Sequence, residues 1–150
     1  MPPRVAPYGS WRSPITAELL TRGGVTLRWL GASGDTLYWL EGRPHEGGRE
    51  VLVRRTPDGR VADVIPPELN ARTRVHEYGG GAAAVKGTTA VVANFSDQRL
   101  YRIDGDAAPI AMTAVPATPS GQRYADGVIS RDGRTLVCVR ERHEGNEVTN

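Results

Sequence analysis

The chain of 150 residues has one cysteine, Cys138, and one lysine, Lys86, among nineteen basic residues. A single cysteine excludes an internal disulfide, so nothing in the sequence indicates an oxidising compartment. The opening residues Met1-Pro2-Pro3-Arg4 have no apolar stretch of a signal peptide behind them, and no run is apolar enough to span a membrane. The sequence therefore predicts a cytoplasmic protein with no membrane partner.

Basic residues are numerous but scattered. No run of them is longer than Arg54-Arg55, and seventeen acidic residues are interleaved, which leaves a net charge of +2. Arginine suits bidentate phosphate contacts, but electrostatic binding of nucleic acid needs the charge gathered in one patch. We therefore expect no nucleic-acid partner.

Residues that hold metals or cofactors are also few. The three histidines, His45, His76 and His143, are far apart in the sequence and do not supply the closely spaced ligands of a zinc site. No Gly-x-Gly-x-x-Gly follows a predicted strand, and no phosphate loop surrounds Lys86. Three aspartates could suggest calcium, but each precedes a glycine in a turn. They are Asp58, Asp104 and Asp132. The sequence predicts neither a metal nor a cofactor.

A serine nucleophile is missing as well. The nucleophile elbow of hydrolases, Gly-x-Ser-x-Gly, places its serine on a turn between a strand and a helix. The nearest match is Gly31-Ala32-Ser33-Gly34-Asp35, which ends in aspartate and lies between two predicted strands. No catalytic triad can be assembled, and no catalytic residue is predicted in this chain.

Eighteen glycines and eleven prolines indicate many turns, which favours short strands over a helical bundle. Residues 1–24 are predicted to form an irregular arm and one short helix. Ser13 would cap that helix, Pro14 would occupy its first position, and Gly23-Gly24 would end it. Ile15, Leu19 and Leu20 would form its apolar face.

From Val25 onward apolar and polar residues alternate, which is typical of strands. Turn signals such as Asp58-Gly59 divide the pattern into units of four strands. The first unit has strands at 25–29, 36–40, 51–53 and 61–65. The second has strands at 80–85, 89–94, 98–103 and 109–112. The third has strands at 124–129, at 135–140 and from 146.

Units that start near residues 25, 80 and 124 give a repeat of about 45 to 55 residues, which is typical of β-propeller blades. The fold class is therefore predicted as all-β, with an incomplete propeller over 25–150. A sandwich of eleven strands is the alternative. Two and a half blades cannot close a ring of roughly four to eight blades, so we expect this to be the front part of a longer protein.

The most unusual stretch, Arg74-Val75-His76-Glu77-Tyr78-Gly79-Gly80-Gly81, precedes the second unit. Three glycines at the start of a strand predict a close approach of the backbone to a neighbouring segment or to a bound molecule. A crowded turn with solvated flanks is the alternative. Because neighbouring side chains of a strand point to opposite faces, only one of His76 and Glu77 would face a ligand.

This stretch resembles a motif near the start of the propeller in serine peptidases of the prolyl oligopeptidase family, most closely the bacterial dipeptidyl aminopeptidase or acylaminoacyl-peptidase type. Four further stretches are similar to segments of that family in the same order. They are 8–16, 94–101, 123–126 and 139–143. One departure is Ala82-Ala83-Ala84, where the family places bulkier strand residues.

The resemblance implies a propeller that covers a separate α/β-hydrolase domain, located C-terminal to it and carrying a Ser-Asp-His triad. The propeller would restrict access to short peptides. The best candidates for residues that bind a peptide terminus at its rim are Arg74, His76, Glu77 and Tyr78, whereas His45 and His143 are expected at the surface. A non-catalytic propeller that binds a protein partner is the second function that the sequence leaves open.

Overall fold

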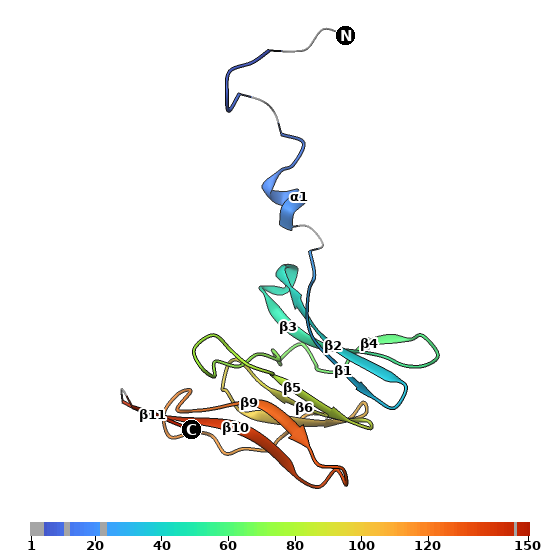
Figure 1. Ribbon diagram of the computed structural model, residues 1–150, viewed down its shortest axis with the longest axis vertical. Helices are drawn as coiled ribbons and strands as arrows, with labels where there is room; N and C mark the ends of the chain where they lie inside the picture. Colours follow the sequence, from blue (N-terminus) through green and yellow to red (C-terminus); the bar gives the residue numbers. More distant parts are fainter. Residues whose placement is uncertain (1–4, 11–12, 22–23, 146) are drawn as a thin grey trace.

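The computed structural model describes residues 5–10, 13–21, 24–145 and 147–150. Almost all of the regular structure is β-strand, arranged in three antiparallel sheets (Figure 1). Strands that follow one another in the sequence are neighbours in each sheet. The prediction of an all-β fold is confirmed, and three sheets take the place of the two that a sandwich would have.

The first sheet contains β1 (Thr26–Ser33), β2 (Thr36–Arg43), β3 (Arg49–Arg55) and β4 (Val61–Asp63) in this order. A tight turn pairs Ser33 with Thr36, and a short 3-10 helix, η1 (Pro44–Glu46), joins β2 to β3. The centre of β3 is buried on both faces: Val51, Leu52 and Val53 are all fully buried and belong to the core.

The second sheet contains β5 (Ala83–Lys86), β6 (Thr89–Ala93), β7 (Leu100–Asp104) and β8 (Ile110–Ala111). Its strands are also in sequence order. The bounds differ little from the predicted ones, except that β5 begins three residues later than expected.

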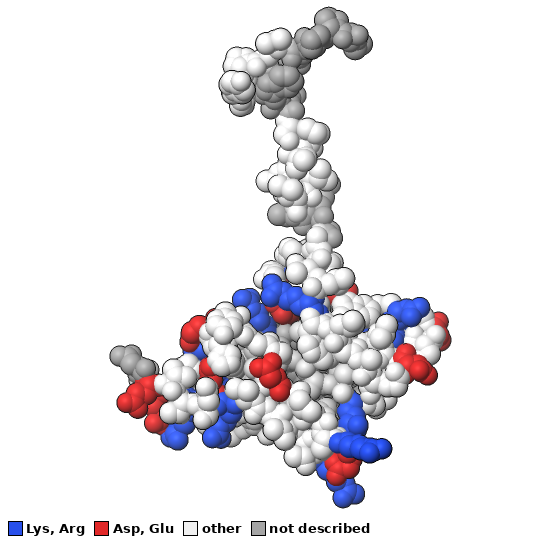
Figure 2. All heavy atoms as spheres, in the orientation of Figure 1, with Lys and Arg blue, Asp and Glu red and all other residues white. Residues whose placement is uncertain are grey.

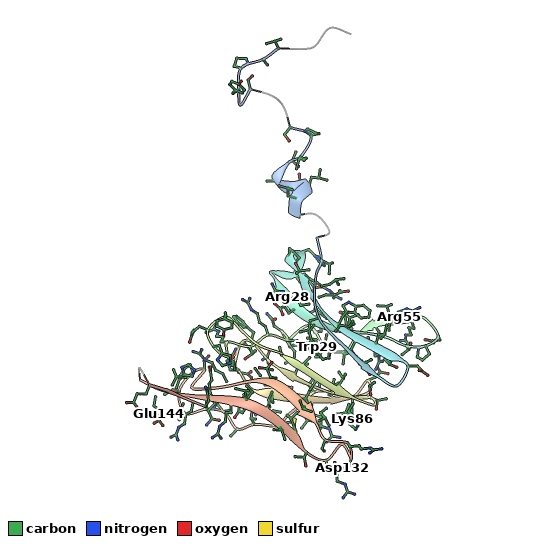
Figure 3. The ribbon with its side chains drawn as sticks, viewed as in Figure 1. Arg28, Trp29, Arg55, Lys86, Asp132 and Glu144 are labelled. Carbon is green, nitrogen blue, oxygen red and sulfur yellow. The ribbon has the colours of Figure 1, made fainter. Side chains whose placement is uncertain are left out.

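The third sheet contains β9 (Gln122–Ile129), β10 (Leu136–Glu144) and β11 (Glu147–Thr149). The predicted turn at Asp132-Gly133 joins β9 to β10, with Gly133 at φ +74°. Asp132 accepts hydrogen bonds from the Ser130 hydroxyl and the Arg134 amide, and these bonds, together with a smaller contribution from the charge of Lys86, lower its pKa. Lys86 and Asp132 lie at the same end of the sheets (Figure 3).

The three sheets are joined through their first strands. β5 contacts β1 on one side and β9 on the other, and it lies between them in Figure 1. Fully buried Leu52 from the first sheet and Val92 and Ile103 from the second belong to one continuous core. Burying these side chains supplies the main attraction between the sheets.

Polar contacts add to this packing between sheets. Arg54 Nη2 lies 2.5 Å from Asp106 Oδ1, and the Tyr38 hydroxyl donates to the Gly87 carbonyl at 3.1 Å. Figure 2 shows basic and acidic side chains close to one another on the face that it presents. Such pairs fix the relative position of two sheets more than they add stability, because exposed ion pairs contribute little.

The N-terminal helix is shorter than predicted. α1 covers Ala17–Thr21, and the Thr16 hydroxyl accepts the Leu19 amide at 3.0 Å, so Thr16 caps it. Ser13 instead accepts the Ile15 amide at 3.0 Å in a local turn, which corrects its predicted role.

The predicted apolar face of the helix is exposed: Ile15, Leu19 and Leu20 do not join the core. The predicted end of the helix at Gly23-Gly24 lies partly outside the described residues, because Gly23 is not among them. In the part of the chain that the structure describes, no helix has the length and apolar character needed to cross a membrane.

Candidate functional site

The stretch that precedes β5 is a turn rather than the start of a strand. The Glu77 amide donates to the Arg74 carbonyl at 3.0 Å, and the Gly79 amide donates to the Val75 carbonyl at 2.8 Å. His76 and Glu77 have φ values of +57° and +64°, in the left-handed region that non-glycine residues rarely adopt. The strand predicted from Gly80 begins instead at Ala83, and the left-handed residues before it form a turn rather than a pleat. His76 and Glu77 do not face opposite sides of a strand, and both contact the third sheet.

His76 is held by Glu141 of β10. One carboxylate oxygen, Oε1, accepts the His76 amide at 2.8 Å and lies 3.1 Å from His76 Nδ1. The other, Oε2, lies 3.1 Å from His143 Nε2. Since an ionised carboxylate can only accept, the His143 ring donates its Nε2–H to Glu141, while the His76 ring lies within ion-pair distance of it.

Glu141 is 3% exposed, which makes its charge unusual for the core. Burial alone would raise the pKa of Glu141, but hydrogen bonds from His143 and from the His76 amide, with the charges of the two rings, hold the pKa below its ordinary value. His143, which was predicted at the surface, is largely covered, with 17% of its side chain exposed. That prediction is wrong because the hydrogen bond to Glu141 holds the ring against the sheet.

Glu77 pairs with Arg123 of β9. Arg123 Nη1 lies 2.5 Å from Glu77 Oε1 and also donates to the Arg74 carbonyl at 2.9 Å. The Arg123 side chain is 12% exposed, whereas that of Glu77 is 75% exposed. The largely buried Arg123 guanidinium therefore orients the exposed Glu77 carboxylate. The carboxylate oxygens can still accept hydrogen bonds on the solvent side.

The other two predicted residues contact aromatic rings. The Arg74 guanidinium carbon lies 4.5 Å from the centre of the Phe95 ring. Tyr78 stacks on His76 with the ring centres 5.8 Å apart and is fully open to solvent on its other side, with 88% of its surface exposed. An exposed aromatic ring that is held by a neighbour offers a fixed apolar contact to a ligand.

A fully buried amide, Gln98, anchors the start of the turn. Its Oε1 accepts the Arg74 amide at 2.8 Å and the Thr73 hydroxyl at 3.4 Å, and its Nε2 donates to the Phe95 carbonyl at 2.8 Å. Gln98 lies in the turn before β7, so the second sheet holds one end of the stretch while the third sheet holds the other.

The glycines allow a close approach to β9, as predicted, and the partner is a neighbouring segment. A Cβ atom on Gly80 would lie 3.0 Å from the Ala125 Cβ, and one on Gly81 would lie 2.8 Å from Asp126 Oδ1. The Gly81 amide donates to Asp126 Oδ1 at 2.7 Å, and the Asp126 amide returns a bond to the Gly81 carbonyl at 2.8 Å. Ala82–Ala84, the departure from the family pattern, are all buried.

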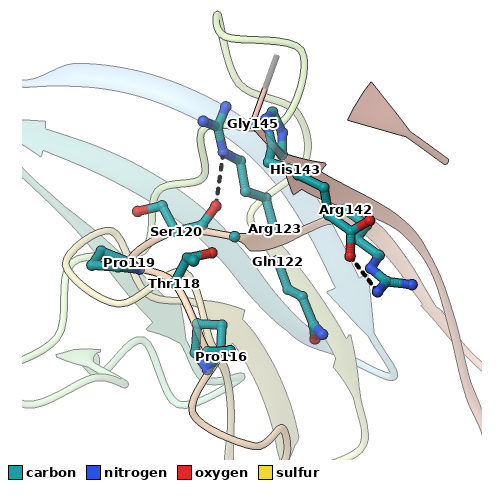
Figure 4. Close-up of a pocket in the computed structure, with 12 residues that line it drawn as sticks. Pro116, Thr118, Pro119, Ser120, Gln122, Arg123, Arg142, His143 and Gly145 are labelled. Atoms are coloured by element: carbon teal, nitrogen blue, oxygen red, sulfur yellow. Dashed lines mark hydrogen bonds and ion pairs between the residues drawn. The ribbon is translucent and has the colours of Figure 1, made fainter. Parts of the chain in front are cut away.

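A cavity of about 600 Å³ adjoins this turn (Figure 4). The loop 116–121 forms one wall, and the end of β10 with Gly145 forms the other. Arg123 and His143, which contact the turn directly or through Glu141, also line the cavity. The site is therefore a polar hollow that is lined by the third sheet and the loop leading into it, beside the turn that precedes the second sheet.

Sequence reasoning missed Gln98, Arg123 and Glu141 as parts of this site. All three lie in stretches that carry the family resemblance, but their contacts with the turn connect residues 24 to 65 positions apart. His45 lies on η1 with 58% of its side chain exposed, as expected. In the ranges described by the structure, no group of three histidine, cysteine or acidic residues is placed to hold a metal ion.

Comparison with solved structures gives strong matches. A Mycobacterium tuberculosis puromycin-hydrolyzing peptidase is 39% identical, with a TM-score of 0.82, over 96% of this chain and 23% of that chain. A puromycin hydrolase, and a mutant of it complexed with PGG, are also 39% identical, with TM-scores of 0.83, over 93% of this chain and 22% of theirs. The chain thus spans less than a quarter of these relatives. A scan of protein-family models gave no match, and neither did a search of the curated proteins.

Proposed function

Because this chain matches the N-terminal part of peptidases of the prolyl oligopeptidase family, we propose that it is the first part of a β-propeller that gates a serine peptidase. The observation that carries the proposal is the 39% identity over nearly the whole chain. Domain boundaries at 1–24 and 25–150, with blades from about residues 25, 80 and 124, are part of the proposal, as is a separate α/β-hydrolase domain.

The outer faces of the terminal sheets support further blades. On the third sheet Val128 and Val137 pair across two strands and are 66% and 67% exposed. On the first sheet Leu27 and Leu30 are 72% and 74% exposed. Apolar side chains in such rows are unfavourable in water and are typical of surfaces that another element covers.

We further propose that Arg74, His76, Glu77 and Tyr78 contact one end of a short peptide at the mouth of the propeller. The exposed Glu77 carboxylate would meet a positive group, and the Tyr78 ring would pack on a side chain. A dipeptidyl aminopeptidase or acylaminoacyl-peptidase specificity belongs to this proposal. A non-catalytic propeller for a protein partner is the second candidate, supported by the same exposed turn.

The 150-residue chain alone is expected to hydrolyse neither puromycin nor peptide p-nitroanilides, since it has no nucleophile elbow. Release of product by the purified chain is the measurement. Activity should appear only when the chain is continuous with a hydrolase domain. Hydrolysis by the chain alone that a serine-directed reagent abolishes would contradict the proposal.

Glu77→Ala, in the protein that joins these sheets to a hydrolase domain, should raise KM for short peptides about tenfold, since a charge-assisted contact of this kind is worth roughly 1.5–3 kcal/mol. Stability should change by less than about 1 kcal/mol, because the Glu77 side chain is mostly exposed. Asp106→Ala, at an exposed acid that pairs with the largely buried Arg54 away from the site, is the matched control. Unchanged peptide kinetics in Glu77→Ala would remove Glu77 from the site.

A further inference from the structure

A second cavity, of about 360 Å³, lies on the other side of the glycine stretch. The first sheet forms one wall, with Leu40 and Glu50 at its base, and Gly79–Gly81 form the opposite wall. Arg28 and Trp29 of β1 also line it, and Figure 3 labels both on the first sheet. This cavity shares no lining residue with the larger one beside Arg123.

Glu50 is the unusual residue in this cavity. It lies at the start of β3, on the same face as Leu52, and these two residues pair with Gly42 and Leu40 of β2. Leu40 and Leu52 are buried in the core, and Glu50 is 8% exposed. The alternation along β3 predicts an apolar side chain at the position of Glu50. Burial of a carboxylate there costs desolvation free energy unless a partner compensates for it.

The backbone of Glu50 is fully engaged, which fixes the position of its side chain. Its amide donates to Asn70 Oδ1 at 3.0 Å, and its carbonyl accepts the Ala71 amide at 2.8 Å. Among the described residues, the charged neighbour recorded for the carboxylate is Arg28, with Nη1 at 3.6 Å from Oε1, beyond hydrogen-bond distance. The Arg28 side chain is 61% exposed, so the pair is weak and Arg28 can turn toward solvent.

A second arginine, Arg72, also lines the cavity, but its guanidinium carbon lies 4.8 Å from the centre of the Phe95 ring, so it has an aromatic partner of its own. Trp29 and the exposed Tyr78 bring two aromatic rings to the cavity, and ring faces attract positive charge. The Trp29 backbone has φ +36° and lies at a bulge in the pairing of β1 with β2. Such a strained bulge changes the direction in which the side chain points. The glycines add no side chains that would fill the space.

We propose that this cavity binds a primary ammonium group, with the Glu50 carboxylate as its anionic partner. Three ammonium hydrogens can use both carboxylate oxygens, to which no other described residue donates a recorded hydrogen bond. One carboxylate is too few ligands for a divalent metal ion. The inference does not depend on the peptidase proposal. The two proposals share Tyr78 alone, and this one is tested by binding rather than by hydrolysis.

The test uses benzylamine as the cationic aromatic probe and benzyl alcohol as its neutral analogue, titrated into the 150-residue chain. Binding is followed by calorimetry and by the NMR shifts of the Gly79–Gly81 amides. We expect benzylamine to bind at least about tenfold more tightly than benzyl alcohol. Glu50→Gln should abolish this preference, and Glu68→Gln, at an exposed acid outside the cavity, should leave it unchanged.

Arg28→Gln is an independent test, because it removes the guanidinium beside the cavity and leaves the buried Glu50 in place. If the cavity takes a cation, removing the competing guanidinium should tighten benzylamine binding several-fold. Weaker benzylamine binding in Arg28→Gln, equal binding of the two probes, or an undiminished preference in folded Glu50→Gln would each overturn the inference. Preferential binding of benzoate, lost in Arg28→Gln, would show an anion site instead.

Discussion

Gln98→Leu is expected to lower the free energy of unfolding by about 3–5 kcal/mol, because several polar groups lose their partner at roughly 1–3 kcal/mol each. The side chain is fully buried and makes three hydrogen bonds, to the Arg74 amide, the Thr73 hydroxyl and the Phe95 carbonyl. Leucine has a similar volume but leaves these groups without a partner. Urea denaturation of the chain, followed by far-UV circular dichroism, measures the loss.

The chain's other glutamine supplies the matched control for Gln98→Leu. Gln122 is half-buried and accepts one hydrogen bond, from the Tyr124 hydroxyl at 2.8 Å. Gln122→Leu should cost about 1 kcal/mol or less, the typical worth of one such bond. Equal losses in the two variants would mean that Gln98 fills space rather than holding the turn.

The second large effect concerns Glu141→Gln and its dependence on pH. Because hydrogen bonds and two histidines hold the folded-state pKa of Glu141 below its ordinary 4.5, the unfolded chain takes up a proton first as the pH falls. The stabilisation is therefore complete above about pH 4.5 and is lost as the pH falls through the folded-state pKa. Glu141→Gln should cost about 2–4 kcal/mol at neutral pH, since it weakens a buried charge-assisted network.

The difference in unfolding free energy between wild type and Glu141→Gln should therefore shrink as the pH falls below 4.5. Glu144→Gln, on the same strand but exposed, is the control and should show no such change. The NMR signals of the Gly79–Gly81 amides report whether the turn moves. A difference that grows as the pH falls would contradict the role given to Glu141.

Gln98 and Glu141 give the candidate site its architecture. Each is a buried polar side chain from a different sheet, and together they fix the two ends of a turn whose own backbone is strained at His76 and Glu77. Strained backbone persists only where the surroundings hold it. The exposed Glu77 and Tyr78 are thus presented on a rigid support, which is what a binding site requires.

The sequence by itself determined the strands and their grouping, because these depend on neighbours in the chain. Alternation of apolar residues is read over a few positions, and turns such as Asp58-Gly59 and Asp132-Gly133 are specified by the residues that form them. Asp58 and Asp132 accept hydrogen bonds from their own turns, as predicted. The family resemblance likewise depends on order and identity alone.

Only the tertiary structure decided how the stretch before β5 is folded and what holds it. The triple glycine predicted a close approach but not its partner, since β9 is 45 residues further along the chain. The left-handed backbone at His76 and Glu77 opposes their local preferences and is imposed by Glu141, Arg123 and Gln98. Contacts between distant segments depend on how sheets pack, and that information is carried by the whole core rather than by any local pattern.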